Sequence, residues 1–250
     1  MQHWELILFF LAIAFIYASV GFGGGSSYLA ILAVYQLPVF EMKLIGLVCN
    51  IIVVTGGCIL FIRNKQLDLK KILPLVILSI PMAYLGAMIK ISADTFFVIL
   101  GCSLIIASVL LFLNTKAVDQ INTRNNIVKN SAMGGAIGFL SGMVGIGGGI
   151  FLSPLLHLSK WDVPKKIAAT ASVFILVNSI SGLAAHLSKP APAHIDYSRI
   201  LLLCGAVLVG GQLGSRVGIV KLNGVTIRRV TGMLVFAAGV EVLVKHLHFF

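Results

Sequence analysis

Gly21-Phe-Gly-Gly-Gly25 interrupts an uncharged, apolar segment that extends over residues 6–40. A closely similar stretch, Gly145-Ile-Gly-Gly-Gly149, interrupts a second uncharged segment over residues 131–156. Glycine destabilises a helix by about 1 kcal/mol per residue relative to alanine, so four glycines in five positions favour an unwound backbone. Each stretch therefore predicts a helix that breaks inside an apolar segment, with a new helix beginning directly after the break.

The charged residues are distributed as in a protein that crosses a membrane several times. Only 11% of the 250 residues are charged, whereas soluble domains contain about 25%. Residues 44–62, 72–89 and 95–113 form further runs without Asp, Glu, Lys or Arg, each long enough to span the hydrocarbon core as a helix. The net charge of +11 does not indicate nucleic-acid binding, because the basic residues lie in short connections between apolar segments.

The two glycine stretches, 124 residues apart, belong to a longer internal repeat. Later pairs follow in the same order at offsets of 125, 128, 128 and 131: Gly57 with Gly182, Gln66-Leu-Asp-Leu69 with His194-Ile-Asp-Tyr197, Leu85-Gly-Ala87 with Leu213-Gly-Ser215, and Gly101 with Gly232. We therefore expect an all-α polytopic membrane protein of two homologous four-segment repeats, each opening with a glycine-broken helix hairpin. The repeats are residues 1–113 and 131–250, and a polar linker joins them at 114–130.

Two topologies are compatible with this repeat, and the distribution of basic residues favours one of them. Eight full crossings place ten Lys and Arg residues on one side and nine on the other, which sets no orientation. If each glycine-broken segment enters and leaves on the same side, the second repeat is inverted. Fourteen basic residues then lie on the linker side and five on the other. The inverted topology is therefore preferred, with a cytoplasmic linker, although eight crossings stay open as an alternative.

The glycine breaks are the predicted substrate site. Unwound backbone is tolerated at membrane depth only where it is buried in protein or lines a cavity. A helix that begins there presents free N–H groups and a positive dipole end, which suit an anion. Paired broken helices in matching positions of two repeats are typical of transporter binding sites. Polar side chains of the next segments either line the pathway or join helices to one another. The predicted substrate-binding residues are Gly23, Gly24, Gly25, Ser26, Ser27, Gly147, Gly148, Gly149, Asn50, Thr170, Ser172 and Asn178.

A packing role is the alternative for both glycine stretches, because small residues let transmembrane helices approach closely. That alternative corresponds to a non-transporting membrane subunit or assembly factor. Arg216 and His186 are the candidates for a counter-charge or for proton coupling, against placement at the membrane interface. The chain has no G-x-S-x-G, H-E-x-x-H, P-loop or C-x-x-C sequence, so we predict no enzyme, no metal and no cofactor.

The same residues resemble the sulfite exporter TauE/SafE family of membrane permeases. The resemblance covers nearly the whole chain and is strongest in the duplicated glycine motif. It is carried by Gly21–Gly25, Gly142-Met-Val-Gly-Ile-Gly-Gly-Gly149, Ala168-Ala-Thr-Ala-Ser172, Asn178-Ser-Ile-Ser-Gly182 and Gly211-Gln-Leu-Gly-Ser-Arg216. The first repeat departs from it, because Leu44–Asn50 stands where the second has the Ala-Thr-Ala-Ser stretch, and this weakens a symmetric role for Thr170 and Ser172.

The resemblance implies a multi-pass transporter of the inner cell membrane, in contact with the lipid bilayer. Its expected substrate is a small anion such as sulfite, thiosulfate or an organosulfonate. A secondary transporter is the function that we expect, with a non-transporting subunit as the alternative. The sequence sets neither the direction of transport nor the oligomeric state.

Overall fold

The computed structural model describes residues 4–113, 126–190, 192, 195–220, 232–233, 235–237 and 239–244, and in these residues the chain is helical, without strands. The helices are α1 (Glu5–Ala18), α2 (Gly25–Val34), α3 (Val39–Arg63), α4 (Leu69–Met88), α5 (Ala93–Leu113), α6 (Ile127–Val144), α7 (Gly149–Leu158), α8 (Pro164–Leu187) and α9 (Tyr197–Val220). Within this described part, α3, α4, α5, α8 and α9 are long and apolar enough to cross a membrane. The expected all-α polytopic membrane fold is confirmed. Most of the linker predicted at 114–130 lies outside the described residues.

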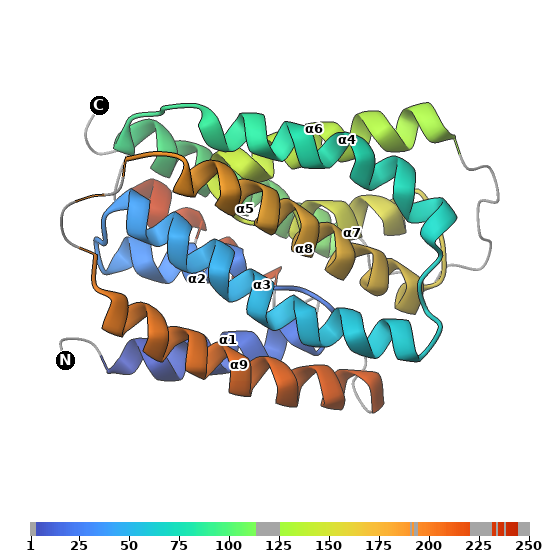
Figure 1. The fold of residues 1–250 in the computed structure, drawn as a ribbon, viewed down its shortest axis with the longest axis horizontal. Helices are drawn as coiled ribbons and strands as arrows, with labels where there is room; N and C mark the ends of the chain where they lie inside the picture. The colour runs from blue at the N-terminus through green and yellow to red at the C-terminus, as the bar shows by residue number, and fades with distance from the viewer. Residues whose placement is uncertain are drawn as a thin grey trace.

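The long helices lie side by side along the long axis of the molecule, and two pairs of shorter helices turn back within it (Figure 1). In that view α1 runs inward from the left-hand end and α2 returns toward the same end. Helix α6 runs inward from the right-hand end, and α7 returns to it. Each turn falls at a glycine stretch, residues 19–24 and 145–148, where the helical structure stops.

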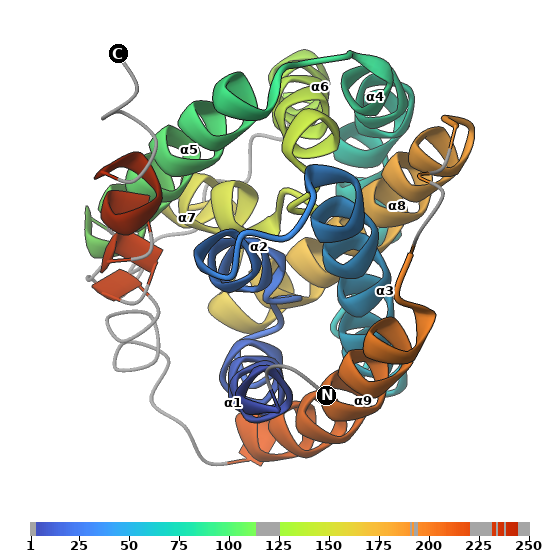
Figure 2. The same ribbon diagram turned by 90° about the vertical axis from the view of Figure 1, so that its left-hand side faces the viewer.

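Helices α2 and α7 lie in the interior of the bundle, surrounded by longer helices (Figure 2). The first six residues of each, 25–30 and 149–154, are all buried. Large apolar side chains on the outer helices point away from the protein instead, for example Ile77, which is 61% exposed, and Leu201, which is 72% exposed. An interior of buried short helices inside an apolar outer surface is the arrangement expected for a protein with lipid as its surrounding solvent.

Close helix packing depends on a second set of glycines, distinct from the two breaks. Gly134, Gly138 and Gly142 recur every four residues on α6, and a Cβ on any of them would collide with a backbone carbonyl of α4. Gly210 and Gly214 of α9 meet carbonyls of α1 in the same way. These stripes allow the backbones of α4 and α6, and of α1 and α9, to approach closely, as small-residue motifs do in membranes.

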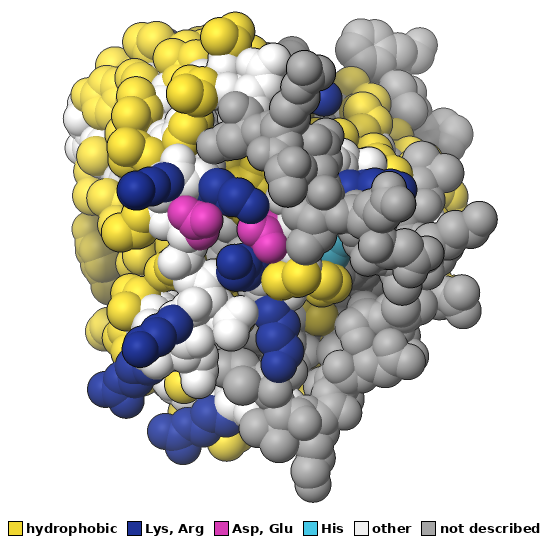
Figure 3. Space-filling view, turned by 90° about the vertical axis from the view of Figure 1, so that its right-hand side faces the viewer, with side chains coloured by type: hydrophobic (Ala, Val, Ile, Leu, Met, Phe, Trp, Pro, Cys, Tyr) yellow, Lys and Arg dark blue, Asp and Glu magenta, His cyan; other side chains and the backbone are white. Residues whose placement is uncertain are grey.

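Basic side chains gather at the right-hand end of the molecule, where α3 ends, α4 and α6 begin, and α7 connects to α8 (Figure 3). The described residues at these helix ends include Arg63, Lys70, Lys71, Lys165 and Lys166. The opposite end holds fewer basic residues, among them Lys90, Lys189 and Arg199. The two ends of the bundle therefore differ in charge.

Candidate functional site

The two glycine breaks share left-handed glycines at their first and fourth positions but differ at the third, where Gly147 has a φ of 85° and its counterpart Gly23 is not left-handed. Gly21 and Gly24 have φ values of 82° and 85°, and Gly145 and Gly148, each 124 residues later, have φ values of 89° and 82°. Residues with side chains rarely adopt these left-handed values, so glycine is required there. Gly24 and Gly148 are the N-caps of α2 and α7, and neither cap supplies a side-chain hydrogen bond. Both helices therefore begin inside the protein, and their first N–H groups need partners other than the side chain of the N-cap residue.

Asn50 joins the two breaks. This residue is fully buried in the middle of α3. Its side-chain Oδ1 accepts a hydrogen bond from the N–H of Gly25 at 2.9 Å, and its Nδ2 donates to the carbonyl of Ile146 at 2.8 Å. A single amide thus contacts the first turn of α2 and the unwound backbone before α7, which brings together segments more than 120 residues apart in the chain.

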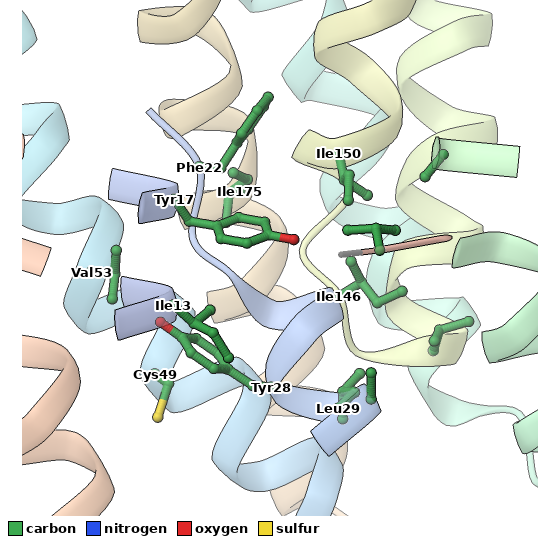
Figure 4. Packing of buried hydrophobic residues seen from close by; sticks show 14 of the residues in the cluster. Ile13, Tyr17, Phe22, Tyr28, Leu29, Cys49, Val53, Ile146, Ile150 and Ile175 are labelled. Carbon is green, nitrogen blue, oxygen red and sulfur yellow. The ribbon is translucent and has the colours of Figure 1, made fainter. Parts of the chain in front are cut away.

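Ile175 of α8 lies against the second break as Asn50 lies against the first. A Cβ on Gly25 would overlap the Asn50 amide, and a Cβ on Gly149 would overlap the Ile175 side chain. Gly147 lies between the two, with both side chains 2.9 Å from the place where its Cβ would be. Figure 4 shows Ile175, Ile146, Ile150 and Phe22 packed around the breaks, so apolar side chains adjoin this polar bridge.

Hydroxyl groups form a second set of contacts with the breaks. Ser172 Oγ of α8 donates to the carbonyl of Gly21 at 2.7 Å, which ties α8 to the first break. Ser27 Oγ, in the first turn of α2, shares a 2.6 Å hydrogen bond with the hydroxyl of Tyr17. Of the predicted site residues, Ser27, Asn50 and Ser172 therefore hold the breaks in position through side chains, while the glycines form the breaks themselves.

Several buried polar atoms close to these elements have no hydrogen-bond partner in the described part of the chain. They are Ser26 Oγ and Tyr28 Oη on α2, Asn178 Oδ1 and Ser179 Oγ on α8, and Ser215 Oγ on α9. Ser179 Oγ is 2.9 Å from the place where a Cβ of Gly147 would be, so it faces the second break. A buried polar atom without a partner costs about 1–3 kcal/mol, which a bound polar ligand or water offsets. Ser179 Oγ is therefore available to a ligand at the second break.

The remaining predicted residues lie in other settings. Thr170 Oγ1 donates to the carbonyl of Lys166 and Asn178 Nδ2 to that of Phe174, both within α8. Arg216 is exposed on α9. His186 is buried near the end of α8, where its Nε2 lies 3.0 Å from the carbonyl of Phe40. The described contacts do not bring Arg216 or His186 to the breaks.

Lys43 is a buried cation that is not among the predicted site residues. Its side chain packs on Gly145, its Nζ donates to the carbonyl of Met143 at 2.7 Å, and it lies 4.8 Å from the centre of the Phe96 ring. The ion pairs of the described residues do not include Lys43. In the sequence, Lys43 lies one residue before the uncharged segment 44–62. The helix begins earlier, at Val39, so Lys43 lies within α3 rather than in the connection before it.

The described residues contain no cluster of three His, Cys, Asp or Glu side chains that is arranged to hold a metal ion. The chemistry available at the breaks is therefore that of backbone N–H groups, hydroxyls, one amide and a nearby ammonium group. Such donors bind oxygen atoms of anions.

Comparison with known proteins assigns the chain to one group. Residues 6–242 match the model of the sulfite exporter TauE/SafE family. A "probable membrane transporter protein y4hK" of Sinorhizobium fredii is 28% identical over 244 residues, covering 95% of this chain and 97% of the relative. A "probable membrane transporter protein YunE" of Bacillus subtilis is 27% identical, covering 79% and 82%. No solved structure matches the chain significantly.

Proposed function

The chain belongs to the sulfite exporter TauE/SafE family and is a multi-pass membrane transporter rather than an enzyme, and on this premise we propose that it is a secondary transporter of a small anion. Sulfite, thiosulfate and organosulfonates are the substrates that we propose. All three present oxygen atoms with delocalised negative charge, which backbone N–H groups and hydroxyls bind without a metal.

The observation that carries this proposal is the meeting of both glycine breaks at Asn50. Helices α2 and α7 begin at these breaks, inside the bundle. Both N-caps are glycines without a side-chain acceptor, but the N–H of Gly25 is bonded to Asn50, whereas no hydrogen bond among the described residues has the N–H of Gly149 as its donor. We therefore assign the anion to the N-terminus of α7, with Ser179 Oγ as an additional donor. Helix N-termini stabilise anions through oriented N–H groups and the helix dipole.

Lys43 supplies the positive charge in this proposal. Its ammonium group is buried at the end of α6, where it donates to the carbonyl of Met143, two residues before the second break begins at Gly145. A buried charge is strongly disfavoured unless it is compensated. Lys43 has a carbonyl and an aromatic ring as partners, and an entering anion would add the missing opposite charge. This assignment replaces Arg216, which is exposed, as the counter-charge, and leaves His186 as a neighbour of Lys43 at the same end.

We further propose that residues 1–113 and 131–250 are inverted repeats joined by the linker 114–130. Reciprocal packing supports this: α4 packs along α6, and α9 packs along α1. Likewise α4 contacts α8, and α9 contacts α3. The matched φ values at the first and fourth positions of the breaks and the opposite directions of the two helix hairpins (Figure 1) point the same way. The basic end in Figure 3 would then be cytoplasmic, because positive charges are retained on that side.

Alternating access follows from this arrangement. One repeat would rock against the other around a site near the midplane, so that the anion reaches one side at a time.

Topology can be tested independently of transport. A cysteine introduced at Lys165 should react with an impermeant thiol reagent only after cells are permeabilised. Reaction in intact cells would contradict the inverted topology.

Transport itself is tested by reconstituting the purified protein in liposomes and measuring uptake of sulfite, thiosulfate and sulfoacetate. We expect uptake of at least one of them, and its loss in Gly24→Leu and Gly148→Leu. Gly205→Leu is the matched control, because a side chain at this α9 position meets no atom within 4 Å. Absence of uptake for every anion by well-folded protein would favour the rival, a non-transporting membrane subunit. Uptake that survives both break variants would show that the breaks are not the site.

A further inference from the structure

Two ion pairs lie at opposite ends of the bundle. At the linker end, Lys71 Nζ lies 2.8 Å from Asp162 Oδ2. At the other end, Arg199 Nη1 lies 3.4 Å from Glu41 Oε2. In each pair the acid is the buried partner, with side-chain exposures of 4% for Asp162 and 9% for Glu41, and the base is partly exposed.

The two bases occupy matching positions. Lys71 and Arg199 are 128 residues apart, the offset that also relates Gln66–Leu69 to His194–Tyr197. Lys71 lies in the first turn of α4, and its backbone N–H donates to Oδ1 of Asp68, the N-cap of that helix. Arg199 lies in the first turn of α9, and its N–H donates to Oδ1 of Asp196. The same local structure, an aspartate cap followed by a base three residues later, therefore presents a cation at each end of the molecule.

Each pair connects the two halves of the chain. Lys71 belongs to α4 of the first half, and Asp162 precedes α8 of the second half. Arg199 belongs to α9 of the second half, and Glu41 lies in the first turn of α3 in the first half. Lys71 Nζ also lies 5.4 Å from the centre of the buried Trp161 ring, beside Asp162. One pair thus closes the contact between halves at the linker end, and the other closes it at the far end.

We propose that these two ion pairs are the latches of the transport cycle, each of which breaks when its own end of the protein opens. The proposal rests on the alternating access proposed above. Opening one end separates the halves there and breaks the pair at that end, while the pair at the other end stays made. Both pairs are made in this structure, which is therefore closed at both ends. Losing one pair destabilises only the states that are closed at that end, so the population shifts toward the state that is open there.

Two reporter positions are suited to a test of the latches. Gly57 lies near the linker end of α3, and an added Cβ would have no neighbour closer than 3.8 Å. Gly182 lies near the opposite end of α8, and its nearest neighbour would be Leu47 at 3.5 Å. Gly57→Cys and Gly182→Cys are introduced singly, after the four native cysteines are replaced by alanine. The rate of reaction with a bulky hydrophilic maleimide then reports the opening of each end in detergent.

The latch variants are Asp162→Asn and Glu41→Gln, which remove the buried acid and leave a base that reaches water. We expect Asp162→Asn to raise the reaction rate at position 57 by about fivefold and to lower it at position 182, as for a coupling of about 1 kcal/mol. Glu41→Gln should do the reverse. If each variant changes the reaction rates at positions 57 and 182 in the same direction, or changes neither rate, the proposal is overturned. Loosened packing predicts the first result, and a purely structural role predicts the second.

Two controls separate the latches from local charge effects and from the transport proposal. Asp196 also pairs with Arg199, at 3.2 Å, but both residues belong to the second half. Asp196→Asn removes this pair within one half and keeps the helix cap, since Asn caps as well as Asp, so it should leave both rates unchanged. Exchanging the charges, Lys71→Asp with Asp162→Lys, should restore the original rates. Uptake of the three anions is measured on the same variants. Opposite changes in the two reaction rates without anion uptake would support the latches and contradict the proposed substrates. Anion uptake without opposite changes in the reaction rates would overturn the latches alone.

Discussion

Asn50 and Ile175, 125 residues apart in the chain, face the two glycine breaks from α3 and α8. Asn50 touches Gly25 at the start of α2, and Ile175 touches Gly149 at the start of α7. One of these matching positions is therefore an amide and the other is apolar. Among the described residues, the hydrogen bonds that link one break to the other come from Asn50 of α3, and the N-terminus of α7 has no amide side chain as a partner. This asymmetry is why we place the anion at the second break.

Replacing Asn50 should disrupt both breaks at once. Asn50→Leu leaves the N–H of Gly25 and the carbonyl of Ile146 buried without partners, so the free energy of unfolding should fall by about 2 kcal/mol or more. We expect anion uptake to fall with it. Thr55→Val is the control on the same helix, because the exposed Thr55 bonds only to the carbonyl of Ile51. Thermal unfolding in detergent and uptake in liposomes measure the two effects, and an Asn50→Leu protein with normal uptake would contradict the assigned bridge.

A second amide opposite Asn50 should change the site without removing the bridge. Ile175→Asn places a polar group beside Gly147 and Gly149, where the side chain is now apolar. The new amide competes with the anion for the N–H groups of α7, so we expect the half-saturating anion concentration to rise about tenfold, which corresponds to about 1.4 kcal/mol. Ile175→Val, which keeps an apolar contact, should leave that concentration within about twofold. An unchanged concentration in Ile175→Asn would argue against binding at α7.

The packing glycines should affect stability rather than substrate affinity. A side chain in Gly142→Ala would meet the backbone carbonyl of Ala83, so α6 and α4 must separate. We expect lower expression and a lower unfolding temperature, with an unchanged half-saturating anion concentration in the protein that does fold. Gly205→Ala, in open space on α9, should be neutral or stabilising, because alanine favours a helix over glycine by about 1 kcal/mol. Gel filtration and thermal unfolding of both variants make this comparison.

Removing the charge of Lys43 should weaken anion binding. Charge-assisted hydrogen bonds contribute about 1.5–3 kcal/mol, so Lys43→Gln should raise the half-saturating anion concentration by about tenfold or more. Lys43→Arg keeps the charge and should raise the half-saturating anion concentration less than Lys43→Gln does. Lys70→Gln removes an exposed charge from the basic end and should have little effect. Equal uptake kinetics for Lys43→Gln and the parent would show that Lys43 only caps α6.

The linker-end ion pair should persist in mildly acidic conditions. Burial alone would raise the pKa of the Asp162 carboxyl, but hydrogen bonds from Lys71 and from the N–H of Val163, with the charges of Lys71 and Lys166, hold that pKa below its ordinary value of 3.8. A carboxyl with a lowered folded-state pKa stabilises the protein above its unfolded-state pKa and loses that contribution as the pH falls through the folded-state pKa. The difference in unfolding temperature between the parent and Asp162→Asn should therefore be constant from about pH 8 to pH 5 and shrink below about pH 4. A difference that disappears already near pH 6 would contradict this account.

The sequence by itself determined the class of fold. Uncharged apolar runs admit only membrane-spanning helices, because unpaired backbone groups cannot be left in lipid. The two runs of four glycines in five residues predicted breaks, since glycine disfavours helix and alone adopts the φ values found there. These are local properties of the chain, so they can be read without knowing which helices meet.

Only the tertiary structure decided which polar groups come together. Asn50 and Asn178 look equivalent as amides in apolar segments, yet Asn50 joins both breaks, while Asn178 donates within its own helix. Lys43, Lys71 and Arg199 are all basic residues near helix ends, yet one is buried beside a break and two form ion pairs between the halves. The physical reason is that each of these roles depends on the rotation and depth of a helix against a distant neighbour. Packing between segments more than 90 residues apart sets that rotation and depth.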